Sequence, residues 1–285
     1  MPTTPTRRKR RLGQLLERLR LDAGLNLRDA AELLRVREPT ASRYETGQIR
    51  PGWPALQALL GLYGADEAKR AEAAVLWEDA GEPATRVVTP AGSSRAFRAF
   101  LRAEAEADTE RALSPLVVPG LLQTVAYARA INASGRQFHV SERTERYVTA
   151  RMNRQVRLTE ANPLKLHALI DEAVIRRVIG DTSVMIDQLN HLVQMGKHDN
   201  VTIQVVAFRA GAYATMEGAF MIIGYAADDL PVVFVEDAAG GVWVENENDV
   251  GQFAAMFDEV TDLALTPEDS AALIASGVRD LEKRK

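Results

Sequence analysis

The sequence predicts an α+β protein made of two domains: an all-α bundle of five helices, then an α+β domain with a small, mostly antiparallel sheet flanked by helices. Three observations predict this order. Apolar residues recur at helical spacing through residues 12–80, a stretch containing Pro83, Pro90 and Gly92 interrupts the pattern, and β-branched and aromatic runs gather beyond Pro163. We therefore expect a basic flexible arm over residues 1–11, a helical domain over 12–81, a linker over 82–94 and a second domain over 95–285.

In the first domain, we expect helices over residues 12–23, 27–35, 38–46, 53–63 and 66–80. Leu12, Leu15, Leu16 and Leu19 fall on one face of the first helix. Asn26 is a good N-cap for the second helix, because its side chain can accept a hydrogen bond from a free backbone N–H. Proline is tolerated in the first turn of a helix, so Pro39 fits the start of the third.

In the second domain, helices are expected first and strands later. The expected helices cover residues 95–113, 121–133, 141–160, 171–179 and 182–195, with two closing helices over 248–263 and 267–281. Alternating or β-branched runs predict strands over residues 164–170, 201–208, 218–225, 231–236 and 241–245.

The composition excludes several classes of protein. The chain has 285 residues, 46% of them hydrophobic, which is enough for two domains with their own cores. It contains no cysteine, so disulfides, thiolate metal sites and cysteine nucleophiles are excluded. No apolar run approaches the roughly 18 residues of a membrane span, and no apolar segment follows the basic N-terminal residues, so we expect no signal peptide. We expect a protein of the reducing cytoplasm.

Charge is distributed unevenly along the chain. Residues 1–50 hold 12 Lys and Arg against 6 Asp and Glu, whereas the remainder holds 23 against 33. An acidic protein with a basic head is typical of a chain in which only the head meets a polyanion.

Residues 27–46 read as a short helix, a tight turn and a second short helix. Ala31, Val36 and Tyr44 are the expected packing contacts, and Glu45 is expected to meet buried backbone or a charge partner. A small residue at position 31 suits two helices that cross steeply. The outward face of the second helix is then polar, formed by Glu38, Pro39, Thr40, Ser42 and Arg43.

The stretch L-N-L-R-D-A-A-E-L-L-R-V-R-E-P-T-A-S-R-Y-E-T-G-Q-I-R-P, residues 25–51, resembles the phage-repressor-like (Xre-type) helix-turn-helix family of transcriptional regulators. The resemblance implies that the second helix enters the major groove of DNA, where Arg43 suits guanine and Glu38 suits the amino group of cytosine. It implies base contacts from Glu38, Pro39, Ser42 and Arg43. It implies phosphate contacts from Asn26, Leu27 (through its backbone N–H), Arg28, Thr40 and Arg50.

This sequence departs from the family pattern at several positions, two of which lie at helix ends. Arg35 stands where the turn glycine is usual, and Arg37 stands where a Ser or Thr cap is usual. The alternative reading of the head is a five-helix bundle that binds protein instead of DNA. The basic stretch of residues 7–11 either tracks phosphates or a minor groove, or only aids solubility.

Beyond the linker, the chain contains V-P-G-L-L-Q-T-V-A-Y-A-R-A, R-M-N-R-Q, I-D-E-A-V-I-R-R-V-I-G, Q-L-N-H-L, N-V-T-I-Q-V-V-A-F-R-A-G-A-Y, G-A-F-M-I-I-G-Y and F-V-E-D. Together these segments resemble the uncharacterised DUF5753 domain found behind such helix-turn-helix heads in streptomycetes and related actinobacteria. The resemblance implies a regulator of a family whose members often sit beside genes for small partner proteins of another uncharacterised family, DUF397. Val118-Pro119-Gly120 is either scaffold or part of a recognition groove.

The second domain offers little that predicts catalysis. His191 and His198 have no third ligand at metal spacing, and no phosphate loop, nucleophile elbow or kinase signature occurs. We expect no enzyme, no metal and no cofactor. An enzyme with a DNA-targeting head remains an alternative, which Arg151, Glu172 and Glu236 around a deep pocket would favour. The expected ligand or partner surface comprises Tyr213, Trp243, Phe220 and Arg151, with Tyr213 and Trp243 the best candidates for exposure.

The sequence thus predicts a cytoplasmic, nucleoid-associated transcriptional regulator that binds specific sites in double-stranded DNA as a homodimer. Its second domain is expected to sense a small-molecule effector or to bind a small DUF397-type protein. The alternative is a toxin–antitoxin-like or adaptor protein whose main role is to bind that partner, with DNA binding autoregulatory.

Overall fold

The computed structural model describes residues 7–81, 95–134, 141–216, 218–225, 230–236 and 241–283. The chain divides into two compact units, Met1–Arg86 and Val87–Lys285, and each is described by itself. The expected linker, residues 82–94, lies outside the described residues.

The described part of the first unit forms the expected five-helix bundle. Its core gathers Leu12, Leu15 and Leu16 against Leu56 and Leu60, all at most 1% exposed. The helices are α1 (Arg7–Asp22), α2 (Leu27–Leu34), α3 (Glu38–Glu45), α4 (Trp53–Leu62) and α5 (Glu67–Asp79).

The prediction of a flexible arm over residues 1–11 is wrong for its last five residues, because α1 begins at Arg7. Two glycines account for the close packing of α1 on α3. A Cβ at Gly13 would overlap the carbonyl oxygen of Glu45, and a Cβ at Gly47 would lie 2.6 Å from the backbone nitrogen of Arg10. Gly47 also has a φ of +67°, a conformation that residues with a Cβ rarely adopt. The basic turn of α1 is therefore seated on the end of α3.

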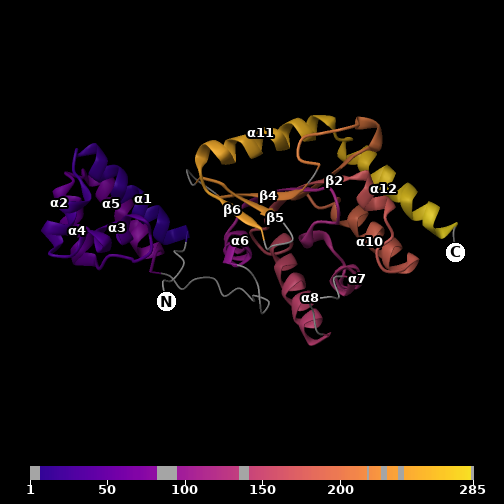
Figure 1. The fold of residues 1–285 in the computed structure, drawn as a ribbon, viewed down its shortest axis with the longest axis horizontal. Coiled ribbons are helices and arrows are strands. Elements are labelled where there is room, and N and C mark those ends of the chain that lie inside the picture. The colour runs from indigo at the N-terminus through magenta and orange to yellow at the C-terminus, as the bar shows by residue number, and fades with distance from the viewer. Residues whose placement is uncertain are drawn as a thin grey trace. The chain divides into compact units, whose positions relative to one another are not determined.

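The second unit is built on a six-stranded sheet with helices on both faces (Figure 1). Its strands are β1 (Thr109–Ser114), β2 (Lys165–Asp171), β3 (Val201–Val206), β4 (Ala219–Gly224), β5 (Val232–Glu236) and β6 (Val242–Val244). Its helices are α6 (Arg95–Ala105), α7 (Val125–Ser134), α8 (Ser141–Gln155), α9 (Glu172–Arg176), α10 (Thr182–Met195), α11 (Glu247–Leu263) and α12 (Pro267–Glu282), with 3-10 turns η1 (Gly120–Leu122), η2 (Val156–Leu158) and η3 (Phe208–Ala210).

The sheet is mixed, so the expectation of a mostly antiparallel sheet is wrong. The strand order is β3-β2-β1-β4-β5-β6; β1, β2 and β3 pair in parallel, and β4, β5 and β6 continue antiparallel from β1. The parallel pairs arise because α7 and α8 connect β1 to β2, and α9 and α10 connect β2 to β3. The chain then returns to the other side of β1, so β1 is the point where the direction of winding reverses.

Alternation along the strands gives the sheet two separate apolar faces. Phe220 and Ile222 of β4 pack with Phe257 of α11 on one face. Met221 and Ile223 pack on the other face, in the larger core that α6, α7, α10 and α12 complete. Figure 1 shows α11 lying along one side of the sheet and α6 and α8 on the opposite side. Among the described residues, no helix is long and apolar enough to span a bilayer.

Candidate functional site

The pair α2 and α3 has the geometry of a helix-turn-helix. Asn26 caps α2 as expected, through a reciprocal capping box with Asp29. After α2, Arg35 adopts the left-handed conformation (φ 52°, ψ 41°), and the N–H of Val36 donates to the carbonyl of Ala31 at 3.0 Å. Arginine thus occupies the conformation that glycine usually supplies, at a cost of about 1–2 kcal/mol.

The face of α3 expected to read bases is open to solvent. Glu38, Pro39 and Arg43 are exposed, while Thr40 and Ser42 are half-buried. Arg37 occupies the N-cap position and makes no side-chain capping bond, as its side chain predicts. The outward face is therefore short and polar, with one long cation in its last turn.

A buried ion pair fixes the far end of α3. Arg20 of α1 donates to both carboxylate oxygens of Glu45, at 2.7 and 2.8 Å, and to the carbonyl of Leu25 at 2.9 Å. The two side chains are 8% and 7% exposed. The hydrogen bonds to Glu45 raise the pKa of Arg20, against the opposing effect of burial. Glu45 therefore has the charge partner that the sequence left open.

The residues expected to contact phosphate occupy different surroundings. Asn26 and Arg28 are exposed at the start of α2, although Arg28 pairs with Glu32 at 2.9 Å. Leu27 is the first residue of α2, and Thr40 belongs to the first turn of α3. Arg50 is half-buried, and its guanidinium lies 3.5 Å from the ring centroid of Trp77 in α5. Arg50 is thus a structural contact of the bundle as well as a candidate phosphate ligand.

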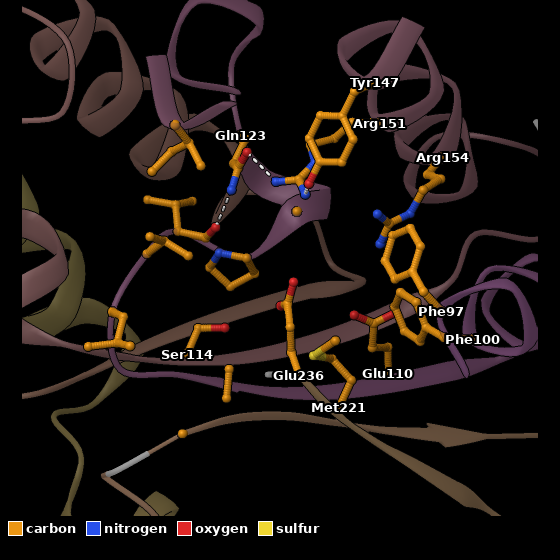
Figure 2. Close-up of a pocket in the computed structure, with 18 residues that line it drawn as sticks. Phe97, Phe100, Glu110, Ser114, Gln123, Tyr147, Arg151, Arg154, Met221 and Glu236 are labelled. Carbon is orange, nitrogen blue, oxygen red and sulfur yellow. Dashed lines mark hydrogen bonds between the residues drawn. The ribbon is translucent and has the colours of Figure 1, made fainter. Parts of the chain in front are cut away.

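A cavity of about 500 Å³ lies in the second unit, against the sheet face that carries α6 and α8 (Figure 2). It is placed where β1 ends, β4 begins and β5 ends, because Ser114, Ala219 and Glu236 all line it. Ligands of open sheets commonly bind beside the strand at which the winding reverses. The other lining residues are Phe97, Phe100, Glu110, Leu116, Val117, Val118, Pro119, Gly120, Gln123, Ile131, Tyr147, Arg151, Arg154, Gly218 and Met221.

Strand alternation explains which sheet residues reach the cavity. Glu110 and Ser114 are four residues apart on β1 and share one face, as do Phe234 and Glu236 on β5. Met221 of β4 pairs directly with Ala112 and Phe234, between those strands. The sheet therefore contributes two carboxyl groups, a hydroxyl and a thioether to one wall.

Helix α8 and turn η1 contribute the opposite wall. One terminal nitrogen of Arg151 donates to Oε1 of Gln123 at 2.6 Å, and the other donates to the hydroxyl of Tyr147. Gln123 is held in this orientation because its Nε2 donates to the carbonyl of Val118 at 2.6 Å. Arg151 is 9% exposed, its Nε is buried without a hydrogen-bond partner, and burial lowers its pKa.

A second arginine of α8 is neutralised by a carboxylate. Arg154 makes two hydrogen bonds to the Glu104 carboxylate of α6 and lies 5.2 Å from the Phe100 ring centroid. Burial lowers the pKa of Arg154, but the attraction of the Glu104 carboxylate is stronger, so the pKa of Arg154 is raised. Burial, followed by repulsion from Glu104, raises the pKa of Glu110 well above its ordinary value. The neutral form of Glu110 is thus favoured, beside an ion pair, more than that of an ordinary carboxyl group.

Glutamine side chains hold the loop that carries η1. Gln155 Nε2 donates to the carbonyl of Gln123 at 2.7 Å, and Gln188 of α10 donates to the carbonyl of Leu122 at 2.7 Å. A Cβ at Gly120 would lie 3.4 Å from Arg154 and 3.7 Å from Arg151. The Val118-Pro119-Gly120 turn, predicted as scaffold or groove, therefore forms part of the cavity wall and is fixed from behind.

The four residues expected to form one ligand or partner surface do not lie together. Tyr213 is 9% exposed and donates to Asp171 at 2.9 Å, and Phe220 is 1% exposed; both belong to the core beneath α11. The expected exposure of Tyr213 is therefore wrong, because its hydroxyl has a partner inside the fold. Trp243 is half-buried and donates to Glu245 at 2.6 Å. Arg151 lines the cavity.

The combination that would favour an enzyme is incomplete. Arg151 and Glu236 share the cavity, whereas Glu172 accepts from the backbone N–H of Phe208 at 2.9 Å and pairs with Arg176. Within the described ranges, no group of three or more His, Asp or Glu is arranged to hold a metal ion.

Glu104, Glu110, Gln123 and Tyr147 are cavity residues or supports that sequence reasoning missed. A signal existed in R-M-N-R-Q, where Arg151 and Arg154 are three residues apart and share a helix face. Nothing in the sequence indicates that Glu104, 50 residues from Arg154, completes the cluster.

The arrangement defines a DNA-binding regulatory protein with a second, cavity-bearing unit, and comparison with known families agrees. Residues 11–73 match the model of the helix-turn-helix domain family. Residues 97–276 match the model described as domain of unknown function (DUF5753). That match covers more than half of the chain, so the chain belongs to the DUF5753 family. Comparisons with curated proteins and with solved structures find no match.

Proposed function

We propose that this protein is a sequence-specific transcriptional regulator whose second unit binds a small effector. The observation that carries the proposal is the exposed face of α3, with Glu38, Pro39 and Arg43 open to solvent on a helix that the Arg20–Glu45 pair holds rigidly. A recognition helix needs such fixed, outward polar groups to meet base edges in the major groove.

We further propose a homodimer. Helix α3 has 8 residues, which reach only a few base pairs, and paired half-sites about 34–36 Å apart are the usual solution. The proposal places the protein on cytoplasmic, nucleoid DNA. Light scattering on the purified chain measures the stoichiometry, and a monomer bound to a single half-site would contradict the dimer.

The experiment that tests the regulator is a genomic footprint of the bound protein followed by gel-shift titration of the recovered site. Binding to the recovered site should exceed binding to random DNA of equal length by about 10³-fold or more at physiological salt. Equal affinity for both, with the same salt dependence, would reduce the head to a nonspecific DNA binder.

For the second unit, we propose binding without chemical turnover. A cavity of about 500 Å³ is in the range of small-molecule sites. Glu172, the third residue of the combination that would favour catalysis, is engaged with Phe208 and Arg176. Unchanged recovery of a bound molecule after prolonged incubation supports this view, and its conversion to a product would contradict it.

A partner protein is the second candidate for the same unit, because large apolar side chains are exposed on it. Leu116, Val156 and Phe208 are 62%, 58% and 59% exposed. A small partner of the DUF397 type would cover such residues. Co-purification of a small protein in equal amount, lost on Phe208→Ser or Val156→Ser, would favour the adaptor reading over effector binding.

A further inference from the structure

The cavity holds a buried cation, Arg151, whose hydrogen-bond partners among the described residues are neutral. Among the described residues, Arg151 donates to the amide oxygen of Gln123 and to the hydroxyl of Tyr147, and to no carboxylate. Removing a charge from water costs several kcal/mol unless an opposite charge compensates it. The neighbouring Arg154 has a direct ion pair with Glu104, whereas no carboxylate of the described residues accepts a hydrogen bond from Arg151.

The rest of the cavity sets limits on what could compensate Arg151. Phe97, Phe100, Ile131 and Met221 provide an apolar lining, which suits an aliphatic or aromatic body. Phe97 and Phe100 lie next to one another with ring centroids 5.9 Å apart, and Phe100 stacks on Phe234 at 4.8 Å. A flat hydrocarbon body would extend this aromatic wall.

Carboxyl groups limit the charge that the cavity accepts. Figure 2 shows the Glu236 carboxylate pointing from the sheet into the space on the side where Arg151 projects from α8. Glu236 and Glu104 both stabilise the charge of Arg151 from a distance, without a direct hydrogen bond. A dianion such as a phosphate monoester would be repelled by the Glu236 carboxylate more than a monoanion would. Glu236 and Ser114 remain available to accept from a hydroxyl or amino group.

We propose that the cavity binds a small carboxylic acid with an aromatic or aliphatic body, its carboxylate paired with Arg151. This assignment rests on the effector role proposed above and names the chemical class of the effector. The guanidinium supplies a planar donor face for the carboxylate. The Phe97–Phe100 wall covers the hydrocarbon body, and Glu236 selects against a second negative charge.

The test uses the full chain and three probes in calorimetric titrations: phenylacetate, its neutral isostere phenylacetamide, and phenyl phosphate. Phenylacetate should bind more tightly than either of the others. Arg151→Met should weaken phenylacetate by about tenfold to a hundredfold, as expected for a lost hydrogen bond to a charged group, and should leave phenylacetamide little changed. Arg146→Met, an exposed arginine of the same helix, is the matched control.

A variant at an exposed position guards against misfolding as an explanation. Glu236 is exposed, so Glu236→Gln should leave the fold intact, strengthen phenylacetate and strengthen phenyl phosphate by a larger factor. Equal affinity for the acid and its amide, equal effects of Arg151→Met and Arg146→Met, or no binding of any probe at millimolar concentration would overturn the assignment. DNA titrations of the same variants test the proposed regulator separately. If the protein binds its operator but none of the acids, the carboxylic acid assignment is wrong and the proposed DNA-binding role is unaffected.

Discussion

The buried ion pair between Arg20 and Glu45 makes a sharp prediction about the recognition helix. Replacing Glu45 by Met removes the carboxylate but keeps a side chain of similar volume. Among the described residues, Arg20 would then keep the carbonyl of Leu25 as its one hydrogen-bond partner, on a side chain that is 8% exposed in the native fold. Removing one member of a buried pair costs about 3–5 kcal/mol, a large part of the roughly 5–15 kcal/mol that holds a domain folded.

Hydrogen–deuterium exchange on the full chain measures this loss without assuming that the two units unfold together. Amides of α1 and α3 should exchange roughly a hundredfold to a few thousandfold faster in Glu45→Met, because each 1.36 kcal/mol corresponds to a factor of ten. Peptides from the second unit should be unchanged. Operator affinity should fall with the protection of α3, because binding then requires the helix to be ordered first.

Two further variants decide whether the pair itself is responsible. Arg20→Met combined with Glu45→Met should recover most of the lost protection, because an apolar pair of similar volume carries no uncompensated charge. Glu32→Met, which removes the exposed partner of Arg28, should have little effect. The Arg20–Glu45 pair does not hold α3 in place if Glu45→Met exchanges like Glu32→Met, or if the double variant is no better protected than the single one.

The remaining predictions concern DNA reading, the helix ends and the cavity. Arg43→Ala should cost about 1–3 kcal/mol on the operator in gel-shift titrations; an equal loss on random DNA would argue against base reading. Arg35→Gly should stabilise the first unit by roughly 0.5–1 kcal/mol in urea unfolding, because the left-handed strain is removed, and Arg35→Ala should not. Arg37→Ser should add about 1 kcal/mol through a new cap; no gain would mean that the cap position is already satisfied. The pKa of Glu110 is raised in the fold, so its contribution to stability is present at acid pH and is lost as the pH rises above the unfolded value of about 4.3. Glu110→Gln should therefore become increasingly more stable than wild type as the pH rises, whereas exposed Glu259→Gln should not.

The first unit could be predicted closely from the sequence because its signals are local. Apolar spacing from Leu12 to Leu19, the Asn26 cap and Gly47 each act within a few residues, and the structure places helices as expected. The length of α1 could not be predicted in the same way. Its basic first turn has no apolar stripe of its own, and its backbone at Arg10 lies against Gly47, 37 positions away in the chain.

Strand β1 was missed, and with it the mixed character of the sheet. Thr109–Ser114 reads T-E-R-A-L-S, which continues an Ala- and Glu-rich helical pattern and has Glu110 at its centre. It becomes a strand because β2 and β4 pair with it on both sides, and such tertiary pairing overrides local preference. The parallel arrangement was available from the sequence, since strands over 164–170 and 201–208 separated by a helix indicate a parallel crossover.

The cavity shows a different limit. Arg151 could be singled out from the sequence, but its surroundings could not. Gln123 lies 28 residues from it in the chain, and Glu104 and Glu236 act on its charge, without a hydrogen bond, from a helix and a strand far away in the sequence. The prediction that Tyr213 and Phe220 belong to a ligand or partner surface is wrong, because both side chains fill the core beneath α11. The residue types alone do not show on which face of the sheet a side chain lies, and that face decides whether the side chain fills the core or lines the cavity.

The close contact between Gly47 and the basic first turn of α1 affects the thermodynamics of DNA binding. A flexible basic arm that orders on DNA would lose conformational entropy on binding and would add to the heat capacity change. Helix α1 begins at Arg7 and its backbone already lies against Gly47 in the free protein. Any phosphate contacts from Arg8 to Arg11 would therefore release counterions without a folding step. Calorimetry should find a salt-dependent affinity with no contribution to the heat capacity change from ordering of the first turn of α1.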